Sequence, residues 1–191
     1  MEPLGTEEEF HKTLDKMHGA TGRHGPFAYA LVRWLEPNIC LETGTWGGVT
    51  TAYIAQALKD NNKGHLTTID DESGVGMDRP MPLSEVRSNL ETMGLASRVT
   101  IIKGDSTQVE YPKNIDFAFI DGGHSYEVCS ADSKKALAEK PRCICWHDSH
   151  NEMGVIRYIA EFRAENPEYQ MLEVDHDFGL AVAILKFPVR R

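Results

Sequence analysis

The fold of this 191-residue chain is indicated by the stretch Ile39-Cys-Leu-Glu-Thr-Gly-Thr-Trp-Gly-Gly-Val-Thr-Thr51. Three apolar residues are followed by a polar turn containing glycine and then by an amphipathic segment that runs to residue 59. This succession is typical of a buried strand that passes through a tight turn into a helix. Glycines in such a turn let a ligand approach the backbone, and the helix N-terminus offers free N–H groups. Taken alone, the turn is explained equally well by a strand-to-helix connection that binds nothing.

The same alternation repeats along the chain. Short apolar runs predict strands at 39–41, 66–69, 99–102, 115–120 and 143–146. Helical periodicity occupies 49–59, 83–93, 126–139 and 153–164, and Gly94 is expected to end the second of these helices. Alternating strands and helices predict a parallel sheet with both faces covered. Five residues join the last two strands, at 170–174 and 180–185, too few for a crossover helix, so we expect an antiparallel hairpin there. The predicted fold is therefore α/β, Rossmann-like and doubly wound, with a mostly parallel sheet of seven strands.

Two helices are expected before the first strand. The first has a capping-box sequence over 6–9, followed by apolar residues at helical intervals, namely Phe10, Leu14 and Met17. Pro26 is suited to the first position of the second helix. The apolar face of that helix is expected to comprise Phe27, Leu31 and Trp34.

Composition excludes several classes of protein. Lys and Arg number 20 against 29 Asp and Glu, and the net charge of −9 argues against a nucleic-acid partner. No run of about 18 apolar residues exists, and the N-terminus lacks the basic and apolar regions of a signal peptide, so we expect a cytoplasmic chain without a membrane partner. The four cysteines are too sparse for a disulfide scaffold. Cys143 and Cys145 would lie on one face of a strand, and we interpret them as small buried hydrophobes.

The residues that follow each apolar run are the informative ones, because ligands of open α/β sheets bind beyond the carboxyl ends of the strands. Four successive runs after the first are followed by polar groups: Asp70, Asp105 with Ser106, Asp121 with His124, and His147 with Asp148. A single acid in such a place is usually a solvated loop residue, but this repetition favours a functional site. Carboxylates and imidazoles that converge there are suited to holding a divalent metal or to acting as a general base. For His150 and Asn151 we favour capping of the helix at 153–164.

The segments LETGTWGGVTT, LTTID, IIKGDS, FIDGGHSYE and CWHDSH resemble, in this order, a class I S-adenosylmethionine (SAM)-dependent methyltransferase. The similarity is to the small-molecule O-methyltransferase-like family that includes the macrolide-sugar O-methyltransferases. It implies a single methyltransferase domain over 1–191, with an N-terminal helical cap at 1–37 and a catalytic core at 38–186. The implied activity is transfer of a methyl group to a hydroxyl of a small-molecule acceptor.

The resemblance also implies which residues bind the cofactor. That set is Glu42, Gly44, Thr45, Trp46, Gly48, Thr50, Asp70, Asp105, Ser106 and Asp121. Within it, Asp70 would bind the ribose hydroxyls, and Asp105 with Ser106 would border the adenine.

The catalytic roles that the resemblance implies fall on the last two strand ends. His124 would be the general base, with Asp121 beside it. Asp121, His147 and Asp148 would hold a divalent metal ion, Mg²⁺ or another, if the reaction uses one. His147 stands where metal-dependent relatives commonly have an acid, which counts against Mg²⁺ because Mg²⁺ prefers oxygen ligands.

Other functions stay open at this point. A nicotinamide (NAD) oxidoreductase is disfavoured because the turn after the first strand lacks G-x-G-x-x-G. A catalytically silent cofactor-binding relative and a hydroxylase-like enzyme are further alternatives, because a fold does not fix a reaction. Acceptor specificity is expected in the N-terminal helices, in 71–82 and in 149–153. So little chain is left for the acceptor that we expect either an open pocket or a wall supplied by a second subunit in a homodimer.

Overall fold

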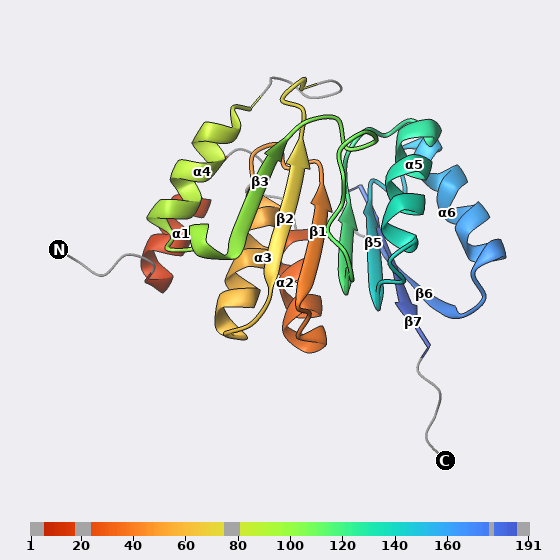
Figure 1. Cartoon of the computed structure of the whole chain (residues 1–191), viewed down its shortest axis with the longest axis horizontal. Helices are drawn as coiled ribbons and strands as arrows, with labels where there is room; N and C mark the ends of the chain where they lie inside the picture. The colour runs from red at the N-terminus through yellow and green to blue at the C-terminus, as the bar shows by residue number, and fades with distance from the viewer. Residues whose placement is uncertain (1–5, 18–23, 75–80, 176–177, 187–191) are drawn as a thin grey trace, which may run out of the picture.

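The computed structural model describes residues 6–17, 24–74, 81–175 and 178–186. Its centre is a seven-stranded sheet in the order β3-β2-β1-β4-β5-β7-β6 (Figure 1). The strands are β1 (Ile39–Thr43), β2 (His65–Asp70), β3 (Val99–Lys103), β4 (Phe117–Ile120), β5 (Cys143–His147), β6 (Tyr169–Val174) and β7 (Leu180–Leu185). The strand order reverses between β1 and β4, which is where an open α/β sheet forms a crevice for a ligand.

Strand pairing confirms the predicted fold class. The pairs β1–β2, β2–β3, β1–β4 and β4–β5 are parallel. Strand β7 pairs antiparallel with both β5 and β6, so the C-terminal hairpin is present and β7 is the one reversed strand. The carboxyl ends of the five neighbouring parallel strands consequently meet at one edge, the upper edge in Figure 1.

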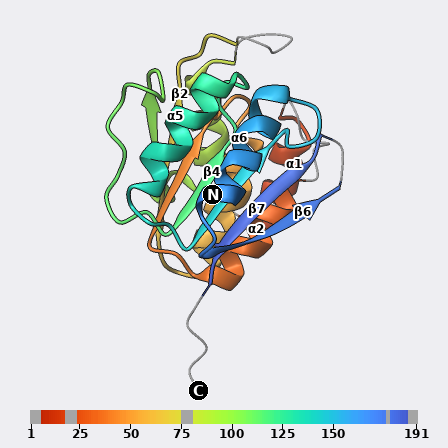
Figure 2. The ribbon, with the colours of Figure 1, turned by 90° about the vertical axis from the view of Figure 1, so that its right-hand side faces the viewer.

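Helices cover both faces of the sheet, as Figures 1 and 2 show from two directions. One face is packed by α1 (Glu7–Leu14), α2 (His24–Leu35), α3 (Val49–Asp60) and α4 (Leu83–Thr92), and the other by α5 (Tyr126–Leu137) and α6 (Met153–Glu165). A short 3-10 helix, Ala96–Arg98, precedes β3. Cys143 and Cys145 belong to the first apolar cluster and Ile144 and Trp146 to the second, as strand alternation requires. All four cysteines are free and buried.

Two helix ends confirm the sequence signals. At the start of α1, Thr6 and Glu9 form both hydrogen bonds of a capping box. At the end of α4, Gly94 is left-handed with φ 65°. The Gly94 and Leu95 N–H groups donate to the Glu91 and Leu90 carbonyls, which is the Schellman pattern.

Two predictions about α2 are wrong. The helix begins at His24, so Pro26 is its third residue, a place where proline is tolerated because the first N–H groups of a helix have no partner inside it. Trp34 is 63% exposed. The buried stripe instead consists of Gly25, Ala28, Leu31, Val32 and Leu35, because α2 packs against α3 and is rotated accordingly. None of the helices in the described residues combines the length and apolar character needed to cross a bilayer.

Candidate active site

A pocket of about 600 Å³ lies at the carboxyl edge of the parallel strands. Its lining comes from the ends of β1, β2, β3 and β4 and from the start of α6. The predicted residues that line it are Gly44, Trp46, Asp70, Asp105, Ser106, Asp121 and His124. Met81 and Glu152 also line it, whereas residues 75–80 of the predicted specificity loop lie outside the described part of the chain.

Gly44 is required by the way β1 leaves the sheet. Its φ is 82°, and a Cβ built on it would lie 1.9 Å from the backbone oxygen of Asp121. The turn is held in this place because the Gly44 N–H donates to the Ile69 carbonyl, and the Asp121 N–H donates to the Thr43 carbonyl, both at 2.9 Å. The turn after β1 therefore packs directly on the turn after β4, and one pocket wall is bare backbone.

Asp70 ties the end of β2 to the same turn. Its Oδ2 accepts a hydrogen bond from the Trp46 N–H at 2.8 Å, and its Oδ1 accepts from the Glu72 N–H at 2.7 Å. Trp46 adopts a left-handed conformation with φ 39°, which is uncommon for a bulky residue. Both oxygens of Asp70 keep lone pairs that can accept from a ligand.

Four residues of the predicted cofactor set lie behind the turn and are not among the pocket-lining residues: Glu42, Thr45, Gly48 and Thr50. Glu42 is fully buried, and its Oε2 accepts from the Thr51 hydroxyl on α3 at 2.5 Å. Its Oε1 is buried without a hydrogen-bond partner. Burial raises the pKa of Glu42 to about 8, since an isolated charge is poorly solvated there.

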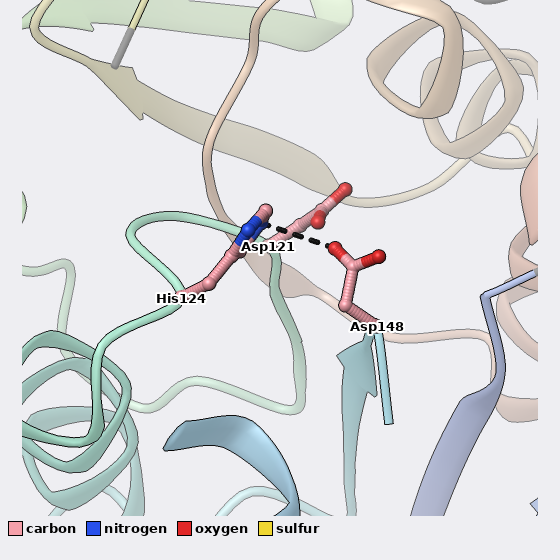
Figure 3. A group of neighbouring side chains, drawn as sticks. All are labelled: Asp121, His124 and Asp148. Atoms are coloured by element: carbon pink, nitrogen blue, oxygen red, sulfur yellow. Dashed lines mark ion pairs between the residues drawn. The ribbon is translucent and has the colours of Figure 1, made fainter. Parts of the chain in front are cut away.

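Two carboxylates and two imidazoles converge at the ends of β4 and β5. His147 Nδ1 lies 3.0 Å from Asp148 Oδ2 and 3.2 Å from Asp121 Oδ1. His124 Nε2 lies 3.0 Å from the same Asp148 oxygen, the ion pair drawn in Figure 3. Figure 3 also shows the side chains of Asp121, His124 and Asp148 pointing toward a common centre. Asp148 reaches it from a left-handed backbone, φ 57°.

Charge determines the protonation of this cluster. Burial lowers the pKa of His147, but Asp121 and Asp148 outweigh burial and raise that pKa to about 10. Contact with Asp148 raises the pKa of His124 above 6.5, against an opposing effect of burial. Burial acts to raise the pKa of Asp148, yet the two histidines hold it well below 3.8. The proton on His147 and the charge on Asp148 therefore stabilise each other.

Sequence reasoning missed one residue near the cluster, His24, and misplaced a helix cap. The His24 ring, at the start of α2, lies with its centroid 4.2 Å from that of His147. Glu152, which belongs to the segment 149–153 expected to determine acceptor specificity, lines the pocket with Oε1 3.8 Å from His124 Nδ1. The predicted helix cap at His150 and Asn151 is wrong, because the N-cap of α6 is Glu152, without a side-chain cap. His150 Nδ1 instead lies 3.4 Å from Asp175 Oδ1.

Comparison with known proteins agrees with this fold. The SAH-bound O-methyltransferase of Bacillus cereus is 23% identical, with a TM-score of 0.71 over 95% of this chain and 92% of that one. The O-methyltransferase TomG of Streptomyces achromogenes, involved in tomaymycin synthesis and solved with SAM, is 18% identical, with a TM-score of 0.70 over 96% and 92%. No curated protein sequence matches the chain. A family model described as a methyltransferase domain matches residues 41–149, more than half of the sequence. The chain therefore belongs to this methyltransferase-domain family.

Proposed function

We propose that this chain transfers the methyl group of SAM to a hydroxyl oxygen of a small-molecule acceptor. The observation that carries the proposal is the single pocket that joins the glycine turn after β1 to His124 and Asp121 after β4. Membership of the methyltransferase-domain family supports the reaction, and the O-methyltransferases solved with SAM or with S-adenosylhomocysteine (SAH) support the cofactor and the acceptor group.

The residues of the pocket fit this cofactor. The bare backbone at Gly44 lies in the wall where the methionine part would bind, and a Cβ there would push this turn away from Asp121. Asp70 stands at the end of β2 with acceptor capacity for the ribose hydroxyls. Asp105 and Ser106 line the next stretch of wall, where the adenine would lie. The volume is within the usual range of small-molecule sites, roughly 300–1,000 Å³.

The chain's own residues supply positioning and a proton acceptor. When bound, SAM supplies an electrophilic methyl group, and its carbon–sulfur bond breaks as the acceptor oxygen takes the methyl. His124 would receive the hydroxyl proton on Nδ1, because Nε2 carries the proton that faces Asp148, and Asp148, 3.0 Å from Nε2, would stabilise the imidazolium that forms. Asp121 lines the pocket beside it and would orient the acceptor. Holding both reactants in one pocket turns a bimolecular encounter into an effectively unimolecular step.

The same cluster fits a divalent metal ion. Asp121, His124 and Asp148 each offer a ligand atom, and these atoms lie within 4.8 Å of one another. His147 Nδ1 lies within 3.2 Å of both carboxylates. Asp121 and Asp148 would hold the ion with His147 as the third ligand, which leaves His124 free to act as the base. The ion would lower the pKa of the acceptor hydroxyl. A nitrogen donor in this set favours a transition metal such as Mn²⁺ or Zn²⁺ over Mg²⁺.

Ligand-dependent stability tests the proposal. SAH at a hundredfold excess over its dissociation constant should stabilise the fold by about 2.7 kcal/mol, and NAD should have no effect. A shift with NAD and none with SAH would contradict the proposed cofactor. The stabilisation by SAH is then measured again with EDTA and with added Mn²⁺, which tests the metal separately from the cofactor. Removal of the metal by EDTA should leave SAH binding intact.

A further inference from the structure

A buried network on α5 lies behind the pocket wall that contains Ser106. Asp132 is fully buried, and its carboxylate accepts hydrogen bonds from the Ser106 hydroxyl at 2.8 Å and from the Tyr111 hydroxyl at 3.0 Å. One turn further along α5, Lys135 Nζ donates to the backbone oxygens of Ser106 and Val109 at 2.8 and 2.7 Å. Helix α5 therefore holds the loop after β3 in two ways: Asp132 accepts from hydroxyl groups of the loop, and Lys135 donates to backbone carbonyls of the loop.

The network accounts for a carboxylate in a place where burial is costly. A buried charge destabilises a fold unless its oxygens receive hydrogen bonds. Burial raises the pKa of Asp132, and the Ser106 and Tyr111 hydroxyls oppose this by donating to the charged form. Lys135 lies over the Tyr111 ring, with Nζ 4.0 Å from the ring centroid, so the positive charge is held nearby. Both oxygens of Asp132 thus have a donor.

The direction of the Ser106 hydrogen bond has a consequence for the pocket. A carboxylate only accepts, and a hydroxyl carries a single proton. Ser106 is a pocket-lining residue and donates that proton to Asp132, so its oxygen has only lone pairs left for a ligand beside it. A ligand group beside Ser106 is therefore favoured if it donates a hydrogen bond and disfavoured if it can only accept.

We propose that Asp132 is a positioning residue that fixes the hydrogen-bond direction of Ser106 and so makes the pocket select a 6-amino purine over a 6-oxo purine. The inference rests on the proposed function, because it takes the adenine of SAM to lie beside Ser106. The 6-amino group of adenine donates to the Ser106 oxygen. The 6-oxo group of hypoxanthine would instead face a second acceptor without a proton between them.

Calorimetric titration with two ligands tests the selection. The probes are SAH and S-inosylhomocysteine, which carries an oxo group in place of the 6-amino group. The folded wild-type chain should bind SAH roughly tenfold to a hundredfold more tightly. In Asp132→Asn the new amide can donate to Ser106, which frees the Ser106 proton for the pocket, so the ratio should fall below about threefold. Tyr111→Phe is the matched control, because it removes the other hydroxyl that donates to Asp132, and Tyr111 is not a pocket-lining residue. This variant should keep the wild-type ratio of the two affinities.

The outcomes separate the inference from the proposed function. Equal wild-type affinity for the two ligands would overturn the selection while leaving the cofactor assignment in place. If Asp132→Asn weakens the binding of both ligands equally, Asp132 has only a structural role, which also overturns the inference. If that variant does not fold, Ser106→Ala decides, since loss of the acceptor oxygen should remove the preference with Asp132 still present. A folded wild-type chain that binds neither ligand overturns the proposed function and the inference with it.

Discussion

Substitution of Gly44 by alanine should damage both the fold and the cofactor site. The added Cβ would lie 1.9 Å from the Asp121 carbonyl oxygen and 2.5 Å from its carbonyl carbon. Both obstacles are backbone atoms, so no side-chain rotation can relieve the contact. Relief requires the turn after β1 to move about 1 Å away from the turn after β4.

Two terms set the magnitude. The left-handed φ of 82° costs an alanine about 1 kcal/mol. Moving the turn weakens the hydrogen bonds from Gly44 to Ile69 and from Asp121 to Thr43, each worth about 0.5–1.5 kcal/mol. We therefore expect Gly44→Ala to lower the free energy of unfolding by about 2–4 kcal/mol. SAH affinity should fall more than tenfold, because the displaced turn is a pocket wall.

Gly94→Ala is the matched control for Gly44→Ala. Gly94 has a similar φ of 65°, but it ends α4 and is not among the pocket-lining residues, so the control carries the conformational term without displacing the pocket wall. Urea unfolding should show a loss of about 1 kcal/mol for Gly94→Ala with unchanged SAH affinity. Equal unfolding midpoints and equal SAH affinities for the two variants would refute the argument that the Gly44–Asp121 contact shapes the site.

Three further predictions concern titratable residues. His124→Ala should lower kcat at least about a hundredfold while keeping SAH affinity within about threefold. His65→Ala, at the opposite edge of the sheet, is the control and should change neither kcat nor SAH affinity. Full turnover without His124 would exclude it as the base. The pKa of His147 is about 10 in the fold against 6.5 unfolded, so its stabilisation is complete below pH 6.5 and is lost as the pH rises to about 10. The urea midpoint of the wild type should fall over that pH range. A similar fall in His147→Gln would show that His147 is not the source of this loss of stability. Glu42 has a pKa of about 8 in the fold against 4.5 unfolded, so its contribution is also lost as the pH rises, from 4.5 to about 8. Glu42→Gln should therefore be more stable than wild type at pH 9. A less stable variant would show that ionisation of Glu42 does not destabilise the fold.

Most of the sheet could be predicted from the sequence because its strands are short apolar runs with short connections. The strand at 180–185 has the predicted bounds, and the helix predicted at 153–164 is one residue longer. The strand predicted at 115–120 begins only at Phe117. The reason is Asp116, whose carboxylate accepts from the Asn38 and Ile39 N–H groups at the edge of the sheet. An apolar count cannot register this local competition between side chain and ladder.

The site was predictable only in part. A place at a strand end predicts where a residue lies more reliably than it predicts where its side chain points. The rule about carboxyl ends found Asp121, His124 and Asp148. It did not anticipate that strand alternation turns Glu42 toward Thr51 on α3, away from the pocket. His24 is brought to the cluster by packing of α2 across the sheet, for which its neighbours in sequence carry no signal.

The departures from local conformational preference give evidence for the site that does not depend on family likeness. Asn62, Asn114 and Lys140 have a positive φ, but they are exposed and lie in turns away from the carboxyl edge. Trp46 and Asp148 also have a positive φ, yet Trp46 lines the pocket and Asp148 is buried in the acid–histidine cluster. Strained backbone costs about 1–3 kcal/mol per residue and persists where the surroundings over-determine it. Its coincidence at one edge with an unpartnered buried carboxylate oxygen, that of Glu42, is what the proposed function expects of an edge shaped for a ligand at the expense of stability.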